Sequence, residues 1–253
     1  MLFNLLGPLA DQFILFNLFN SLTFRAGGAV VTALIVAFLF GPMITGWLRQ
    51  QQPEGQPIRE DGPEGHFRKA GTPTMGGFLI LLAIIISTLL WADLTNGYVW
   101  ALLLITVGFG AIGFADDYQK LNKGHSGGIP GRVRMLAEIV VACAAIFWIM
   151  KLTPAPLTTT LALPFVKNFL IELSWFFAPF AVFVIVGASN SVNLTDGLDG
   201  LAIVPVMIAA GCFGLISYVA GNTVFSSYLL IFSVPGAGEL AVFCGALIGA
   251  GLG

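Results

Sequence analysis

The stretch Asn190-Ser191-Val192-Asn193-Leu194-Thr195-Asp196-Gly197-Leu198-Asp199-Gly200 lies between two long apolar runs, Leu173–Gly187 and Leu201–Ala220. Each run approaches the ~20 residues that a helix needs to cross a bilayer. Polar residues at a membrane boundary are costly unless they have partners or a task, and no Lys or Arg lies near these in the sequence. The pattern therefore predicts two membrane-spanning helices joined by a polar segment at one membrane face.

The same stretch also fits an ordinary helix cap. Asp196 as N-cap, with Asp199 at the third helical position, resembles a capping box and would start the next span without any chemistry. A cap does not explain the two asparagines. Nor does it explain Gly197 and Gly200, which leave bare backbone where a bulky anion can approach. We therefore favour a functional segment.

The composition is that of an integral membrane protein. Hydrophobic residues make up 57% of the chain and charged residues 9%, and the mean hydropathy is +0.91. The lengths of the apolar segments favour helices and exclude barrel strands, so we expect one all-α membrane domain, 1–253, with about seven spans. The net charge of -2 is too small to indicate nucleic acid as a partner. The apolar segments are Ala26–Leu48, Thr74–Ala92, Tyr98–Ala115, Val133–Met150, Leu173–Gly187, Gly200–Ala220 and Glu239–Gly253.

The distribution of Lys and Arg predicts the orientation. Of 11 such residues, eight follow the first or third apolar segment: Arg49, Arg59, Arg68, Lys69, Lys120, Lys123, Arg132 and Arg134. By the positive-inside rule this face is cytoplasmic and the N-terminus is outside. Segments 49–73, 116–132 and 188–199 then form cytoplasmic active-site loops, and 152–172 lies outside, where it is expected to form a short hairpin.

Two adjacent aspartates, Asp116 and Asp117, close the third apolar segment. They repel each other and lose hydration, which must be offset by a partner. Lys120 is placed for an ordinary ion pair with Asp116, but that accounts for only one acid. A divalent cation, or a role as a base, would account for both, so we favour function here.

Two further polar features have less specific interpretations. Lys69–Gly77 (KAGTPTMGG) places a cation, glycines and hydroxyls at a helix start, as in an anion site. A Thr-Pro helix start with a snorkelling lysine explains it equally well. Glu138, inside the fourth apolar segment, is expected to face the bundle and bond to a neighbour, and we assign it no chemistry.

One membrane face thus combines carboxylates, lysines and glycine-rich loops. Mg²⁺ is usually held by one or two carboxylates plus substrate phosphates, and lysines and backbone amides bind phosphate. The combination favours metal-dependent phosphoryl or phosphosugar transfer, with one substrate drawn from the lipid bilayer. The alternative from another class is an ion-coupled transporter, but transporter sites lie near the midplane, often between internal repeats, and no repeat is visible here.

Three segments carry a resemblance to a known family: Lys69–Gly77, Asp116–Lys120 (DDYQK) and Asn193–Ala202 (NLTDGLDGLA). In order, spacing and topology they resemble the signatures of bacterial phospho-N-acetylmuramoyl-pentapeptide transferases (MraY-type), which are polyprenyl-phosphate N-acetylhexosamine-1-phosphate transferases with ten spans. The resemblance implies that UDP-N-acetylmuramoyl-pentapeptide reacts with undecaprenyl phosphate in the bacterial cytoplasmic (inner) membrane, with Mg²⁺, releasing UMP in peptidoglycan synthesis. Siblings that transfer N-acetylglucosamine-1-phosphate share the acidic pairs, but GTPTMGG resembles the muramoyl-pentapeptide branch. The sequence does not decide between a monomer and a homodimer.

The resemblance also implies roles for individual positions. The catalytic residues would be Asp116, Asp117 and Asp199, of which the first two would also bind Mg²⁺. The nucleotide- or phosphate-binding residues would be Lys69, Lys120, Asn190, Asn193, Asp196, Gly197 and Leu198. The family's main metal ligand and a histidine cluster are expected beyond Gly253, where an unfinished apolar run ends, so residues 1–253 alone are expected to be inactive.

The expected role of Asp117 is positioning rather than deprotonation. A phosphate monoester has a second pKa of ~6 and is largely dianionic at pH 7, so a base gains little. Phosphoryl transfer depends mainly on positioning and charge stabilisation.

Overall fold

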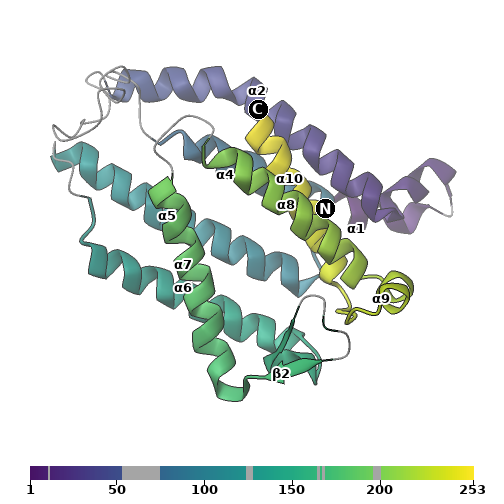
Figure 1. Ribbon diagram of the computed structural model, residues 1–253. Coiled ribbons are helices and arrows are strands. Elements are labelled where there is room, and N and C mark those ends of the chain that lie inside the picture. The colour runs from purple at the N-terminus through teal and green to yellow at the C-terminus, as the bar shows by residue number, and fades with distance from the viewer. Residues whose placement is uncertain (11, 53–74, 124–127, 164–165, 167–168, 196–200) are drawn as a thin grey trace.

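The computed structural model describes residues 1–10, 12–52, 75–123, 128–163, 166, 169–195 and 201–253, and these form an elongated bundle of helices (Figure 1). The predicted all-α membrane bundle is confirmed, since each of the seven apolar segments contains a helix. The long helices are α2 (Leu22–Gln51), α4 (Gly77–Trp91), α5 (Gly97–Lys123), α6 (Gly131–Leu152), α7 (Phe177–Thr195), α8 (Ile203–Ala220) and α10 (Leu240–Leu252). The short elements are α1 (Leu2–Leu6), α9 (Thr223–Leu229), β1 (Thr160–Ala162) and β2 (Leu170–Glu172).

Not every helix is equally suited to crossing a bilayer. Within the described residues, five are long and apolar enough by length and composition: α2, α5, α6, the stretch Ser174–Thr195, and α8. The other two apolar helices, Gly77–Trp91 and Ala237–Leu252, are shorter. The protein is therefore a multi-pass membrane protein.

The helix ends differ from the sequence-based boundaries. Helix α5 continues to Lys123 and α7 to Thr195, so residues 116–123 and 188–195, expected as parts of loops, are helical. Hydropathy locates the stretch that sits in lipid, whereas a helix continues as long as each added residue gains a backbone hydrogen bond. The polar residues at these ends are therefore held on rigid turns.

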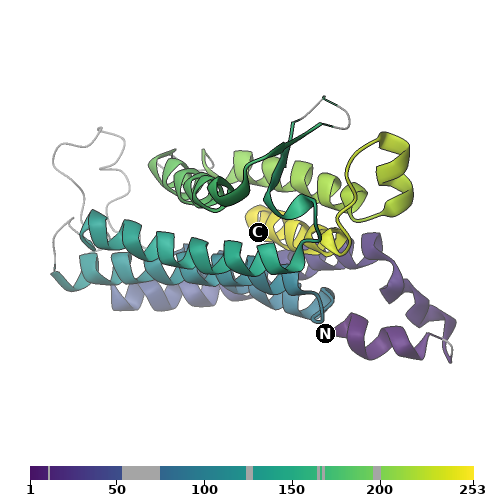
Figure 2. The same ribbon diagram turned by 90° about the horizontal axis from the view of Figure 1, so that it is seen from below.

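The central core is built by α2, α4 and α10, and α8 packs on the outer side of α10 (Figures 1 and 2). Gly245 and Gly249 face α2, where an added Cβ at Gly245 would meet the Ala26 carbonyl oxygen at 2.7 Å and one at Gly249 would collide with the Val30 backbone. Small residues four apart let two membrane helices approach to backbone contact, where van der Waals packing holds them together.

The end of the bundle where α2 and α10 begin is held together by a buried ion pair. Arg25, 3% exposed, donates from both terminal nitrogens to the two carboxylate oxygens of Glu239, each at 2.6 Å. Glu239 also accepts from the backbone N–H of Asp93 at 2.9 Å. This cluster joins the start of α2, the start of α10 and the α4–α5 turn.

Asp93 in that turn is tied to the N-terminal segment. Its carboxylate accepts from Asn4 Nδ2 at 2.9 Å and from the Thr95 N–H and hydroxyl at 2.9 and 2.8 Å. Burial raises the pKa of Asp93, but these hydrogen bonds together lower the pKa by more than burial raises it. The pKa is therefore below its ordinary value. The stabilisation is present above the unfolded-state pKa and is lost as pH falls through the lower folded-state value.

The predicted hairpin in 152–172 is confirmed: β1 pairs antiparallel with β2, with Thr160 opposite Glu172. On the other side of the bundle α5 and α6 pack together, and α7 packs against α6.

Candidate active site

The described parts of the predicted polar segments lie towards one end of the bundle, on the left in Figure 1, where α5 and α7 end and α6 begins. Arg132 and Arg134 lie in the first turn of α6, and Arg49 lies in the last turn of α2 at the same end (Figure 1). The sequence-based grouping of cations with acidic residues on one face is therefore present among the described residues.

Asp116, Asp117 and Lys120 form one compact group on the last turns of α5. Lys120 Nζ lies 2.7 Å from Asp116 Oδ2 and 3.2 Å from Asp117 Oδ1. The expectation that Lys120 pairs with one acid only was wrong, because positions three and four residues away lie on the same helix face. One cation between two carboxylates leaves the group with a formal charge of -1.

The two aspartates differ in environment. Asp116 is 7% exposed, and its Oδ1 accepts from the backbone N–H of Ile129 at 2.7 Å, which fastens the chain before α6 to the end of α5. Gly128 lies directly against this carboxylate, and any Cβ there would collide with it. Asp117, with 32% of its side chain exposed, is better placed to meet a ligand.

The donor set agrees in kind with a magnesium site. Mg²⁺ prefers carboxylate oxygens and commonly keeps waters and substrate phosphates as its other ligands. The contacts of the two carboxylates include one cation, Lys120. Among the described residues no group of three or more His, Cys, Asp or Glu side chains gathers, and Asp116 and Asp117 are the acids that lie together at this end.

Asn190 is held by a neighbouring helix. Its Nδ2 donates to Glu138 Oε2 at 2.6 Å and to the Val186 carbonyl oxygen at 2.9 Å. Glu138 Oε1 accepts from Arg134 Nε at 3.0 Å. Asn193 lies one turn further along α7 and is exposed. Five predicted site residues lie outside the described residues: Lys69, Asp196, Gly197, Leu198 and Asp199. The alternative of a helix cap at Asp196 therefore also falls outside them.

Sequence reasoning expected Glu138 to bond to a neighbour, which is confirmed, but it missed that the neighbour is a predicted site residue. It also missed Arg134 as its second partner. The signal available was an acid inside an apolar helix with an arginine four residues before it, a spacing that allows an ion pair.

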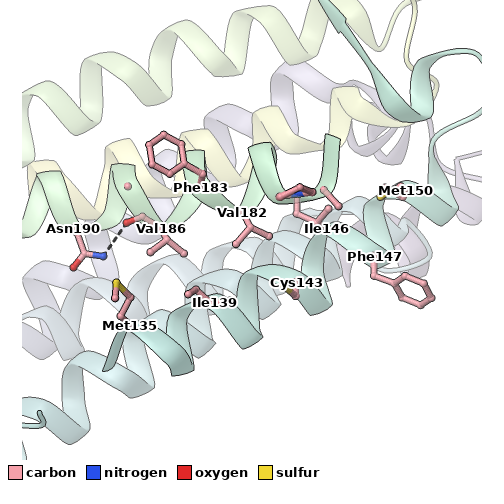
Figure 3. A pocket seen from close by; sticks show the side chains of 13 residues that line it. Met135, Ile139, Cys143, Ile146, Phe147, Met150, Val182, Phe183, Val186 and Asn190 are labelled. Carbon is pink, nitrogen blue, oxygen red and sulfur yellow. Dashed lines mark hydrogen bonds between the residues drawn. The ribbon is translucent and has the colours of Figure 1, made fainter. Parts of the chain in front are cut away.

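An apolar groove of about 710 Å³ runs between α6 and α7 and ends at Asn190 (Figure 3). Met135, Ile139 and Cys143 line it from α6, and Val182 and Val186 from α7. Figure 3 shows Asn190 and Met135 at one end and Met150 at the other, so the groove extends from the polar end of the helices along their length.

Two family models and a curated relative match this chain. Residues 99–253 match the model of glycosyl transferase family 4, and residues 69–81 match signature 1 of the phospho-N-acetylmuramoyl-pentapeptide-transferases. A curated relative from Granulibacter bethesdensis, named phospho-N-acetylmuramoyl-pentapeptide-transferase, is 61% identical over 254 residues, covering 100% of this chain and 70% of the relative. The signature match coincides with the segment that begins at Lys69.

Proposed function

Because this chain belongs to glycosyl transferase family 4, and within it to the phospho-N-acetylmuramoyl-pentapeptide transferases, we propose that it transfers phospho-N-acetylmuramoyl-pentapeptide to undecaprenyl phosphate. The donor is UDP-N-acetylmuramoyl-pentapeptide, and the products are undecaprenyl-pyrophosphoryl-N-acetylmuramoyl-pentapeptide and UMP. The structural observation that supports this most is the Asp116–Asp117–Lys120 group at one end of a membrane bundle.

The two aspartates have different tasks in this proposal. Asp116 is buried and bonded to the Ile129 N–H, so it holds the chain between α5 and α6 in place. Asp117 is more exposed and orients the attacking lipid phosphate, which at pH 7 is already largely dianionic. Lys120 offsets their charge and stays near the site as a phosphate-binding cation.

Mg²⁺ would be held by Asp116 and Asp117 together with substrate phosphates. When bound, it would stabilise the negative charge on the phosphates. We propose that Asp199 is a third catalytic residue and that Lys69, Asn193, Asp196, Gly197 and Leu198 bind the nucleotide or its phosphates, as the family resemblance implies.

The groove between α6 and α7 suits the lipid substrate. Its walls are apolar and it ends at Asn190, so an isoprenoid chain would lie along it with its phosphate towards the polar ends of the helices. Burial of apolar surface would favour this placement over water, though less so over lipid.

Release of UMP tests the proposal. The complete gene product in detergent, with Mg²⁺ and both substrates, is expected to release UMP. No turnover is expected when Mg²⁺ is omitted, or when UDP-N-acetylglucosamine replaces the donor. Turnover with UDP-N-acetylglucosamine would instead assign the chain to the sibling transferases. As the family resemblance implies, we further propose that residues 1–253 alone are inactive, and turnover by them comparable with that of a full-length family member would contradict this.

We propose a cytoplasmic site in the bacterial inner membrane, with the N-terminus outside. Single cysteines at Gln56 and Gly127 should then react with an impermeant maleimide only after the cells are opened. One at Thr159, before the hairpin, should react in intact cells. Labelling of Gln56 from outside would reverse the orientation and exclude a cytoplasmic site.

A further inference from the structure

Glu138 is the most unusual residue in the described bundle outside the acidic pair. It lies in an apolar helix, is 2% exposed and is among the largest fully buried side chains. A buried carboxylate survives only if each oxygen has a partner, because removal from water costs several kcal/mol. The hydrogen-bond partners of Glu138 therefore indicate the role of this carboxylate.

The two oxygens of Glu138 serve two different helices. Oε1 accepts from Arg134, one turn earlier on α6, and Oε2 accepts from Asn190 on α7 at 2.6 Å. The two partners of the Asn190 amide group, the carboxylate oxygen Glu138 Oε2 and the Val186 carbonyl oxygen, are acceptors and have no hydrogen to donate. This fixes the Asn190 NH2 group towards α6 and turns its carbonyl oxygen the other way.

This bond lies where the apolar contact between the helices is incomplete. The groove between α6 and α7 ends at Asn190, and Val186 is the one residue of α7 that is buried. With so little apolar packing, a short charge-assisted hydrogen bond carries much of the alignment at this end.

Arg134 extends the link towards the acidic pair. Arg134 lies in the first turn of α6, directly after the segment that Asp116 fastens through the Ile129 N–H, and its guanidinium is held by Glu138. The end of α5 is thus joined to the chain just before α6 through Asp116 and Ile129, and α6 is joined to the end of α7 through Glu138 and Asn190.

We propose that Glu138 is a positioning residue: through Asn190 and Arg134 it holds the end of α7 in register with the start of α6 and so with the Asp116–Asp117 pair. The proposal rests on the proposed transferase function for its kinetic consequence, but not for its structural one. Asn190 accordingly contributes its carbonyl oxygen to the site while its NH2 group anchors α7.

A reciprocal exchange of the two side chains tests the pairing. Asn190→Asp places two carboxylates against each other and should lower kcat/KM for the nucleotide substrate at least tenfold. Glu138→Gln alone turns an amide NH2 group towards one of two donors, Arg134 Nε or Asn190 Nδ2, and should lower kcat/KM about tenfold. Glu138→Gln with Asn190→Asp restores a donor facing an acceptor between the two helices, but the Val186 carbonyl oxygen still lacks its donor, so the double variant should recover part of the loss relative to Asn190→Asp. Glu172→Gln, the same change on the exposed β2 strand, is the control and should leave kcat/KM unchanged.

A second readout is independent of activity. Spin labels at Leu136 on α6 and Leu194 on α7, both exposed, report the distance between the helix ends in a cysteine-free background. The distance distribution should change in Asn190→Asp and return in the double variant, with protein yield and melting temperature recorded for each.

The outcomes separate the two proposals. Recovery of both activity and distance in the double variant supports positioning by Glu138. An active wild type whose distances do not respond, or a double variant no better than Asn190→Asp, overturns it. Absence of UMP release from every protein, wild type included, with distances that still follow the exchange, rejects the transferase proposal and retains the positioning pair.

Discussion

Replacing Asp117 by asparagine in the complete gene product is expected to lower the rate of UMP release at least a hundredfold. Asp117 is the more exposed acid of the pair and shares Lys120 with Asp116, so in the proposed function its negative charge would act on ligands while Asp116 anchors the chain. Losing a charge that orders phosphate and metal should cost ~3 kcal/mol or more of transition-state stabilisation. Initial rates at saturating substrates measure the effect, and the melting temperature should stay near that of the wild type.

The pH dependence of this variant distinguishes positioning from deprotonation. If Asp117 only positions the lipid phosphate, the rate of Asp117→Asn stays low from pH 6 to 9. Full recovery at high pH would show that Asp117 acts as a base and would contradict our assignment. Asp116→Asn should also be slow but should in addition lower the melting temperature, since Asp116 is buried against Gly128 and Ile129.

Replacing Arg25 by methionine is expected to lower the free energy of unfolding by about 3–5 kcal/mol, because it leaves the Glu239 carboxylate buried without its cation. The two bonds of 2.6 Å and the low exposure of Arg25 make this the strongest pair among the described residues at that end of the bundle. Reversible unfolding in mixed micelles measures the change.

Two further variants show whether the effect comes from the uncompensated charge. Arg25→Met with Glu239→Met removes both charges and should recover most of the loss, as expected for a buried pair replaced by apolar residues. Lys151→Met, an exposed cation over the Phe147 ring at 4.4 Å, should change the stability by less than about 1 kcal/mol. A double variant as unstable as Arg25→Met would show that packing, not charge, carries the stability.

The extent of the helices was only partly predictable. The apolar segments were found because the free energy of placing a segment in lipid depends on the composition of that segment alone. The ends of α5 and α7 were not, because a helix continues past the apolar stretch wherever polar side chains can reach water or each other.

The same distinction holds inside the site. Asp116, Asp117 and Lys120 are neighbours on one helix, so their grouping was readable from spacing, although the second contact of Lys120 was missed. The pairing of Glu138 with Asn190 joins residues 52 apart in the chain, and no local pattern specifies it.

The sequence by itself therefore determined the membrane class, the helical segments, the grouping of cations and acids on one face, and the family. Each of these depends on local composition or on short motifs. Only the tertiary structure decided that Asp116 is an anchor and Asp117 the exposed acid, that Glu138 binds Asn190, and that Arg25 meets Glu239 across 214 residues. Those contacts depend on which helices pack side by side and in what register, and that is settled by the close fit of small residues such as Gly245 and Gly249 against α2.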